Sequence, residues 1–515
     1  MAEAKQPSTL VSAAVSGTAW SSAQTVLARV LAGVSTIVLA RLLTVPDFGF
    51  AGQAASLGAA LAIFVPGPLT DVLISGAGRG GIAVQAARRA SRIVGWLAAL
   101  LVFVSAAAWL AFEPRSMGPW LLFVFCARPV AEAATVVPLA ALRVSLRFRE
   151  IAVADMAAVL GSAAIGVALA ILGFGPFALA IPPVALLVFR AAGYLRCGMP
   201  ALPSPGTDAD PAAVLRPYWA AALAQYAHGL VVTVDVLLLS WMASSSASGL
   251  YVFSISLAMQ AHSLFVLQLS STLQPILVAM GNDLSRQFAA TARAARCITA
   301  IAVPVALCQA VVSESLIRSV FGEKWVPAWP AFSVTCGSMA ISAGVAPLLA
   351  YLKARGMFRF ILVWQFMHLL ALAAAGALAL RGNALPELSA WLGLPFTDAV
   401  VPSLGMATIV LLIWAISLPL AVRCCRPSAV LPGALAFTGL LRPLIVAVPV
   451  MVGGVLARVA LLRSIPSPYG DWAVVLVVAP AVFAAALFGN AAVDPRVRSD
   501  LLGVFGGIRR RLSPW

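Results

Sequence analysis

The sequence predicts an all-α integral membrane protein of about 14 transmembrane helices, arranged as two pseudo-symmetric six-helix lobes followed by a C-terminal helix pair. Three observations lead to this fold class. Hydrophobic residues occupy 62% of the 515 positions and charged residues only 10%, too few to cover a soluble protein of this length. The apolar residues gather into stretches of roughly 20, the length that crosses the hydrocarbon core of a bilayer. Finally, a pattern from the first half of the chain returns in the second half.

Each apolar stretch predicts one membrane span, and the spans fall into three groups along the chain. The first group holds six spans, near residues 17–40, 48–69, 91–112, 119–142, 151–172 and 174–195. The second group holds six more, near 217–240, 248–279, 297–317, 328–352, 360–380 and 399–422. The last pair is expected near 438–460 and 472–492.

The internal repeat is carried by two landmarks that occur in the same order in both halves. Gly49 lies at a short break between two apolar stretches, and Gly249 lies at a similar break 200 positions later. Pro138 precedes a basic segment after the fourth span, and Pro347 does the same 209 positions later. Two landmarks at nearly one offset indicate homologous halves, an organisation on which alternating-access transporters are built.

A loop rich in proline and glycine separates the two groups of six spans and predicts the domain organisation. We expect four parts: an N-terminal six-helix lobe over 1–199, a cytoplasmic linker over 200–216, a C-terminal six-helix lobe over 217–422, and helices 13 and 14 with a basic cytoplasmic tail over 423–515. Because each lobe has an even number of spans, the two repeats are expected to be parallel, related by an axis along the membrane normal.

The net charge of +16 is best explained by the orientation of the helices in the membrane. If the spans alternate from a cytoplasmic N-terminus, most of the 34 basic residues fall in cytoplasmic segments, as the positive-inside rule requires. The exceptions on the periplasmic side include Arg41, Arg115, Arg318, Arg458 and Arg463. Both termini are therefore expected in the cytoplasm. Nucleic acid is not an expected partner, because no basic run carries interleaved aromatic residues.

Four short motifs give the chain its resemblance to a known family. They are Leu39–Gly49 after the first span, Leu142–Arg149 after the fourth, Asp235 with Gly249–Tyr251, and Phe321–Trp325 before the tenth. In this order they resemble the oligosaccharide flippases and polysaccharide exporters of the multidrug/oligosaccharidyl-lipid/polysaccharide (MOP) exporter superfamily. The chain departs from that pattern after Asp235, where Ser240–Ser244 replaces an expected Gly-rich basic stretch.

The resemblance implies a flippase that moves a polyprenyl-diphosphate-linked oligosaccharide across the bacterial cytoplasmic (inner) membrane by alternating access, for exopolysaccharide, capsule or O-antigen assembly. The implied partners are this lipid-linked oligosaccharide, the bilayer, and the polymerase and export machinery of the pathway. Two alternatives stay open: a cation-coupled multidrug antiporter of the same superfamily, and a membrane polysaccharide polymerase. The flippase motifs and the extra helix pair argue against the antiporter. A polymerase would need a large periplasmic loop or a catalytic cluster.

The sequence offers no pattern for enzymatic chemistry or for a bound metal. The seven cysteines are odd in number and form no CxxC pair, so neither a disulfide framework nor a zinc site is indicated. No HExxH motif and no Ser-His-Asp arrangement with supporting context occurs. We therefore expect that the protein is not an enzyme and that it binds no cofactor. Coupling of its activity to a Na⁺ or H⁺ gradient is left open.

Polar side chains inside the first and fourth spans are candidates for the substrate site, because charge in hydrocarbon usually faces a cavity or a partner. Thr25, Arg29 and Thr36 share one face of the first span. Arg29 is the leading candidate for binding the diphosphate, since a guanidinium binds two oxygens at once; the alternative is a structural ion pair. Arg128 is a second substrate candidate and Glu132 a coupling candidate, although such neighbours can simply neutralise each other.

The seventh and eighth spans supply the remaining candidates. Asp235 and His228 share a face of the seventh span, where they could bind a coupling cation or proton or serve helix packing. Gln260 and Gln274 belong to a polar stripe along the eighth span, suited to sugar hydroxyls or to bonds between helices. The 200-residue offset sets Arg29 level with His228, so the predicted site is a cavity between the lobes.

Overall fold

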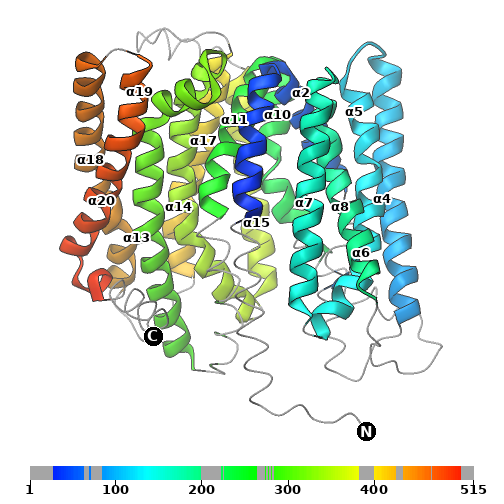
Figure 1. Cartoon of the computed structure of the whole chain (residues 1–515). Coiled ribbons are helices and arrows are strands. Elements are labelled where there is room, and N and C mark those ends of the chain that lie inside the picture. Colours follow the sequence, from blue (N-terminus) through cyan, green and yellow to red (C-terminus); the bar gives the residue numbers. More distant parts are fainter. Residues whose placement is uncertain are drawn as a thin grey trace, which may run out of the picture. The chain divides into compact units, whose positions relative to one another are not determined.

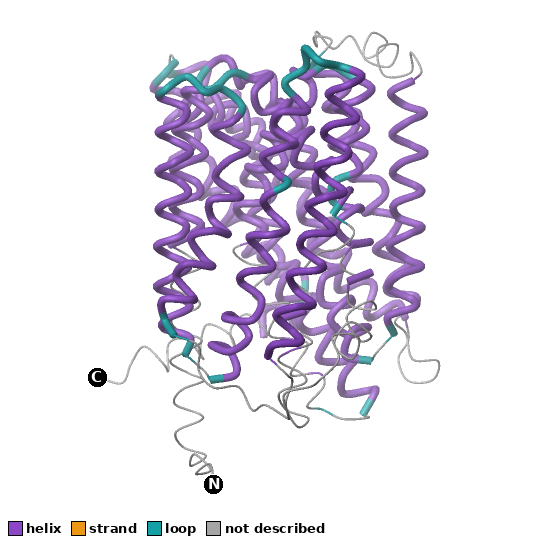
Figure 2. Tube along the Cα trace, turned by 90° about the vertical axis from the view of Figure 1, so that its right-hand side faces the viewer, coloured by secondary structure: helices purple, strands orange, loops and turns teal. Residues whose placement is uncertain are grey.

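The computed structural model describes residues 27–62, 69–70, 73, 84–145, 147–198, 222–223, 226–263, 273, 277, 280, 283–355, 357–381, 399–424, 433–465 and 467–499. Within these ranges the regular secondary structure is helical and contains no strand (Figure 2). Ten helices in this part of the chain are long and apolar enough to cross a membrane. The chain is therefore an all-α, multi-pass membrane protein, as predicted. The count of 14 stays a prediction, because the first, second, seventh and eighth spans extend into residues outside these ranges.

The chain divides into two compact units, Met1–Ser240 and Trp241–Trp515. In the first unit a helix over 27–42 comes before α2. Then follow α2 (Val45–Leu61), α4 (Val84–Phe112), α5 (Gly118–Phe125), α6 (Ala127–Val144), α7 (Phe148–Ile171), α8 (Phe177–Arg196), a short helix over 226–231 and α10 (Val234–Met242). The predicted linker at 200–216 lies outside the described residues, so the predicted domain boundaries remain untested; the division between the compact units falls inside α10.

The second unit begins with the end of α10 and contains the larger set of helices, from green to red in Figure 1. They are α11 (Ser245–His262), α13 (Leu284–Leu316), η2 (Ile317–Phe321), η3 (Glu323–Ala328), α14 (Trp329–Ala354), α15 (Phe358–Arg381), α17 (Val400–Cys424), α18 (Gly433–Ser464), α19 (Tyr469–Ala473), η4 (Val474–Val478) and α20 (Ala479–Val493). Here α18, α19 and α20 pack beside α13 (Figure 1).

The first repeat landmark has the same local geometry in both units. Thr44 and Ser244 are extended residues that each precede a helix, at Val45 and Ser245. The Ser244 hydroxyl accepts a hydrogen bond from the Ala247 amide at 3.1 Å, and the Asp47 carboxylate accepts one from the Thr44 amide at 2.8 Å. Side-chain capping of this kind satisfies backbone groups at a helix start. A capped start at an offset of 200 supports the internal repeat.

The second landmark is also repeated in detail. Pro138 lies inside α6 and Pro347 inside α14. Beyond each proline the helix closes with the same backbone bond, from the Arg147 amide to the Leu142 carbonyl and from the Met357 amide to the Leu352 carbonyl, both at 3.0 Å. The next helix then begins one residue later in each unit. Both halves of the sequence therefore build the same corner.

Two of the predicted spans begin earlier than expected. The helix α4 begins at Val84 instead of near residue 91, and α13 begins at Leu284 instead of near residue 297. The added turns are basic and amphipathic, so a criterion of continuous hydrophobicity excludes them. At 1.5 Å per residue, the 33 residues of α13 extend well beyond roughly 30 Å of hydrocarbon. These turns belong to the helix but not to its apolar part.

Candidate functional site

Arg29 lies near the start of the first described helix, where its side chain is partly exposed. On the same face, Thr36 donates its hydroxyl to the Ala32 carbonyl at 2.8 Å, so this hydroxyl is engaged within its own helix. No ion pair of Arg29 occurs among the residues the structure describes, and Thr25 lies outside them.

Arg128 and Glu132 occupy the beginning of α6, just after the chain bends at Cys126 between α5 and α6. The Arg128 side chain is exposed, and Glu132 is half-buried and has an interaction of its own. The described ion pairs do not include one between these two residues. The roles predicted for Arg128 and Glu132 stay predictions.

The seventh span is broken between the two residues predicted to couple ions. A helix over 226–231 ends in a turn at Val232 and Thr233, and α10 begins at Val234. In the turn, the Thr233 amide bonds the Leu230 carbonyl at 3.2 Å, and the Thr233 hydroxyl donates to the Gly229 carbonyl at 2.9 Å. His228 comes before the break and Asp235 after it. Helix breaks at membrane depth are tolerated where they are buried in protein or line a cavity.

Asp235 and His228 are in different environments on the two sides of this break. Asp235 is 5% exposed and lies in the first turn of α10, where its Oδ1 accepts a hydrogen bond from the Val236 amide at 2.8 Å. His228 is exposed, and both residues take part in further interactions. A negative charge in the first turn of a helix interacts favourably with the helix dipole, and Asp235 occupies this position in α10.

The part of the seventh span before the break is fixed to the first unit. The Tyr226 hydroxyl donates to the Ala60 carbonyl, near the C-terminal end of α2, at 2.7 Å. Ala222 packs in an apolar cluster with residues of α4 and α6, including Val94 and Val137. These contacts place the start of the span within the first compact unit and leave the break as the point where its direction can change.

Gln260 lies in α11, in the second unit. Its Oε1 is buried and has no hydrogen-bond partner among the described residues. One residue beyond α11, the Ser263 hydroxyl donates to the Gln260 carbonyl at 3.0 Å, which uses a second polar group of the predicted stripe inside the helix itself. Gln274 lies outside the described residues. The Gln260 amide oxygen remains an acceptor without a donor, suited to a hydroxyl of a ligand.

A carboxylate in α7 is held by two side chains of α8. The Tyr194 hydroxyl donates to Asp155 Oδ1, and Arg190 Nε lies 3.0 Å from the same oxygen. Gly193 allows this approach, because a β-carbon there would lie only 2.8 Å from the β-carbon of Ala154. Asp155 therefore links α7 to α8 through two side-chain contacts.

A second ion pair at the ends of the same helices is more open to solvent. Arg147 Nε donates to Glu150 Oε1 at 2.6 Å, and both side chains are about one-third exposed. Cys197 follows α8 beside this pair. Burial raises the pKa of the Cys197 thiol above its ordinary value, and the nearby Glu150 carboxylate acts in the same direction. This thiol therefore stays protonated at neutral pH.

The motif Phe321–Trp325 forms a packed corner between α13 and α14. Trp325 is fully buried and stacks on Phe253 of α11 with ring centroids 4.2 Å apart, and Phe321 meets the edge of Phe253 at 5.0 Å. Gly322 makes the turn with φ of 99°, a conformation that side-chain-bearing residues rarely adopt. This motif therefore forms the connection between α13 and α14 in the second unit. Its Glu323 side chain forms an ion pair with Arg318, which belongs to an ion network.

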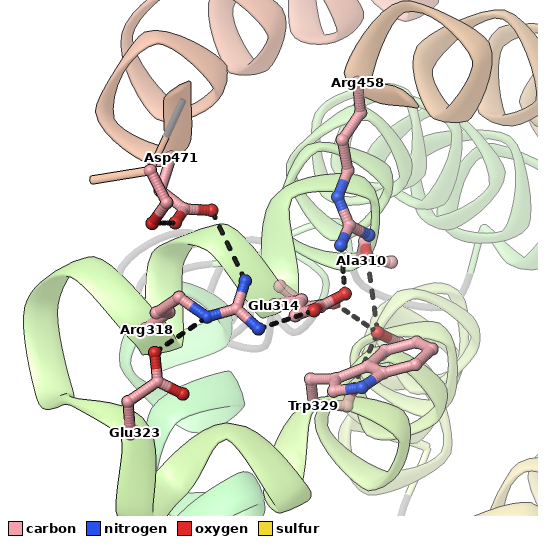
Figure 3. A network of polar contacts seen from close by, with 10 residues as sticks. Ala310, Glu314, Arg318, Glu323, Trp329, Arg458 and Asp471 are labelled. Atoms are coloured by element: carbon pink, nitrogen blue, oxygen red, sulfur yellow. Dashed lines mark hydrogen bonds and ion pairs between the residues drawn. The ribbon is translucent and has the colours of Figure 1, made fainter. Parts of the chain in front are cut away.

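That network joins α13, its η2 extension, α18 and α19 (Figure 3). The Arg318 guanidinium lies 2.9 Å from Glu314, 3.1 Å from Glu323 and 3.7 Å from Asp471. Glu314 also pairs with Arg458 of α18. Asp471 is only 1% exposed, and its Oδ2 accepts a hydrogen bond from the Ser467 hydroxyl at 3.0 Å.

This network was not predicted from the sequence. Arg318 and Arg458 were expected in periplasmic segments, as exceptions to the charge rule and without partners. A usable signal was present in the carboxylate of Glu314, one helical turn before Arg318, because such neighbours pair readily. The contacts to Arg458 and Asp471 join positions more than 140 residues apart, which no spacing in the sequence reveals. Among the described residues, no group of three or more His, Cys, Asp or Glu could hold a metal ion.

Comparison with known proteins gives one family and several related folds. Residues 38–330 match a family model described as "Polysaccharide biosynthesis protein". The fold is similar to that of the lipid II flippase MurJ in an inward closed conformation, with a TM-score of 0.63 and 11% identity over 92% of this chain and 99% of that one. A comparison with curated protein sequences finds no match.

Two other transporters have a related fold over less of the chain. An inward-facing multidrug resistance MATE family transporter of the MOP superfamily matches with a TM-score of 0.56 and 12% identity, over 77% of this chain and 94% of that one. A MOP superfamily transporter from Pyrococcus furiosus matches with a TM-score of 0.50 and 12% identity, over 79% and 96%. At such low identity these similarities establish the fold alone. The family match over residues 38–330 agrees with the predicted resemblance to polysaccharide exporters.

Proposed function

Because this chain belongs to the polysaccharide biosynthesis protein family, we propose that it moves a polyprenyl-diphosphate-linked oligosaccharide across the bacterial cytoplasmic membrane. The movement is by alternating access, and the product serves exopolysaccharide, capsule or O-antigen assembly on the outer side. The protein acts as a transporter and catalyses no covalent step.

The observation that carries the proposal is the extent of the similarity to a lipid II flippase. The MurJ fold covers 92% of this chain, whereas the MATE fold covers 77% although almost all of the MATE chain is matched. The MurJ fold therefore accounts for more of this chain than the MATE fold does. Together with the family match over 38–330, this favours the flippase over the cation-coupled multidrug antiporter.

Arg29 supplies the recognition of the substrate headgroup in this proposal. A diphosphate carries its negative charge on oxygens that a planar guanidinium can bind in pairs. An arginine without an ion pair in the described structure keeps that capacity. Arg128, which is exposed near the start of α6, adds a second cation in the first unit. Gln260, with a buried acceptor, is suited to the glycan hydroxyls.

Asp235 supplies the coupling in this proposal. Its carboxylate lies in the first turn of α10, directly after the break in the seventh span. Discontinuous helices form the ion sites of many transporters. Binding of Na⁺ or H⁺ at Asp235 would change the charge at the hinge and so bias its direction. His228 and Glu132 are the secondary candidates for the same role.

The substrate is tested by identifying the lipid that the protein retains. Mass spectrometry of lipid extracted from the protein, purified in mild detergent from its native host, should detect a polyprenyl diphosphate bearing several sugars. Phospholipid alone in the extract, together with cation-driven drug efflux by the protein, would favour the antiporter. The Arg29→Ala variant provides the matched control, because the glycolipid should be depleted while phospholipid is retained.

A further inference from the structure

The C-terminal helix pair brings one charge of each sign to the second unit. Arg458 comes from α18 and Asp471 from α19, while α13 and η2 provide Glu314 and Arg318. Arg458 pairs with Glu314, and Asp471 lies 3.7 Å from Arg318. The basic residue of the helix pair therefore contacts the acidic residue of α13, and the acidic residue of the helix pair contacts the basic residue of η2 (Figure 3). We call these four residues the charge clamp.

The clamp continues into an apolar contact along the same helices. Val311 and Val312 of α13 pack in one cluster with Val474 and Val478 of η4. The approach of α18 is close enough that a β-carbon at Gly454 would lie 3.1 Å from a γ-methyl of Val311. Polar and apolar contacts therefore join the same two parts of the second unit.

Separation of these parts would be costly inside a membrane. Arg458 is 14% exposed at its side chain and Asp471 1%, so both would lose their counter-charges in a poorly solvated setting. Removal of one partner from a buried ion pair leaves the other charge uncompensated, which is far more harmful than removal of both. Glu314 and Arg318, by contrast, would still pair with each other.

We propose that the charge clamp keeps the C-terminal helix pair docked on α13 throughout the working cycle, so that α18–α20 move with the second unit as one body. The pair is in this sense a fixed extension of that unit. A hinged element that opens away from α13 during transport would have to break the clamp in every cycle.

A charge-removal experiment tests the clamp without any transport assay. The variants Glu314→Gln and Arg458→Met should each lower the apparent melting temperature in detergent by about 2–4 °C. The double variant should be more stable than the sum of the single effects predicts, because both single variants remove the same ion pair and the double variant also removes the Arg458 charge that Glu314→Gln alone leaves without its carboxylate. Arg463→Met is the matched control, since Arg463 is exposed near the end of the same helix. A silent Arg458→Met, or strictly additive effects, would overturn the clamp.

A disulfide experiment tests whether the pair stays docked. The variant carries Val311→Cys and Gly454→Cys, and its seven native cysteines are replaced by alanine. The β-carbons of the two introduced cysteines should lie within the range that a disulfide requires. Val482→Ala makes room, because a β-carbon at Gly454 would lie 2.7 Å from a Val482 methyl. We expect efficient oxidation and unchanged polymer export after oxidation. Failure to cross-link, or export that stops on oxidation and returns on reduction, would overturn the proposal.

The measurement of polymer export after cross-linking rests on the proposed function. The measurement of thermal stability does not. If the reduced variant and the wild type both fail to export polymer, the proposed function is wrong. The melting temperatures of the charge variants then still decide whether the charge clamp exists. The two failures are therefore distinguishable.

Discussion

At the scale of single residues, the proposed function assigns substrate binding to the charge on Arg29. Its replacement by alanine should abolish polymer export while the protein remains in the membrane at normal abundance, because no other described cation of that helix face could take its place. Arg29→Lys should restore export only in part, since a point charge cannot reproduce the planar fork. Export is measured by complementation of a deletion strain and protein abundance by immunoblot.

The matched control for Arg29 is Arg89→Ala, because Arg89 is an exposed arginine in α4. It should export normally. Normal export by Arg29→Ala would assign the headgroup to another cation, with Arg128 as the next to test. Loss of the protein itself from the membrane would assign Arg29 a structural role.

The ion pairs of α7 provide a residue-scale prediction about stability. Asp155→Ala removes the shared acceptor of Tyr194 and Arg190, and should cost about 2–3 kcal/mol, since Arg190 is partly exposed and a fully buried pair costs more. Glu150→Ala removes only an exposed pair and should cost about 0.2–1 kcal/mol. Thermal unfolding in detergent should rank the two variants accordingly. Equal effects would contradict the role assigned to Asp155.

Some site residues could be predicted from the sequence and others could not. Arg29 and Asp235 could be identified from the sequence, because a charged residue inside an apolar stretch is rare. This signal does not depend on which helices are neighbours. The exposure of Arg128 and the charge clamp were not identifiable, since both depend on which helices become neighbours. Helical spacing predicts partners one turn apart, and Arg458 meets a residue on a helix far away in sequence.

At the scale of elements, the broken seventh span makes a prediction about coupling. Asp235→Asn keeps the size of the side chain but removes its charge, so transport should lose its dependence on a Na⁺ or pH gradient. The measurement is uptake of glycolipid into proteoliposomes with and without each gradient. Glu113→Gln, in the exposed turn after α4, is the control and should keep the dependence. An Asp235→Asn variant that still responds to the gradient would remove Asp235 from the coupling step.

Helix positions were largely predictable, and the deviations have physical reasons. Hydrophobicity finds the part of a helix that lies in lipid, so it missed the basic first turns of α13, which begin at a side-chain cap from Asp283 to the Arg286 amide. It also gave the seventh span as continuous. The turn at Thr233 depends on local hydrogen bonds that periodicity does not contain.

At the scale of the whole molecule, the charge rule predicts which side of the membrane each loop faces. Single cysteines at Ser204 and Ser285, in an otherwise cysteine-free chain, should be shielded from a membrane-impermeant thiol reagent in intact cells. A cysteine at Ser389 should react. Labelling at Ser204 with protection at Ser389 would reverse the orientation.

Two exceptions to the charge rule have a structural explanation. Arg318 and Arg458 were assigned to the periplasmic side, and both are neutralised by carboxylates in the second unit. The positive-inside rule counts Lys and Arg and gives little weight to acidic residues, so the predicted orientation rests on the larger number of basic residues in the cytoplasmic segments. The fold class, the repeat and the family could be predicted from composition and motifs because they depend on the chain as a whole.

The central claim is that the protein moves a glycolipid from one leaflet to the other, and a transbilayer assay tests it most directly. Glycolipid extracted from the native host is reconstituted with the protein into liposomes, and the fraction reached by a membrane-impermeant sugar-oxidising reagent is followed over time. We predict that wild-type protein exposes nearly all of the glycolipid, whereas liposomes with Arg29→Ala protein expose only the half in the outer leaflet. If wild-type protein also leaves half of the glycolipid protected, the proposed function is wrong.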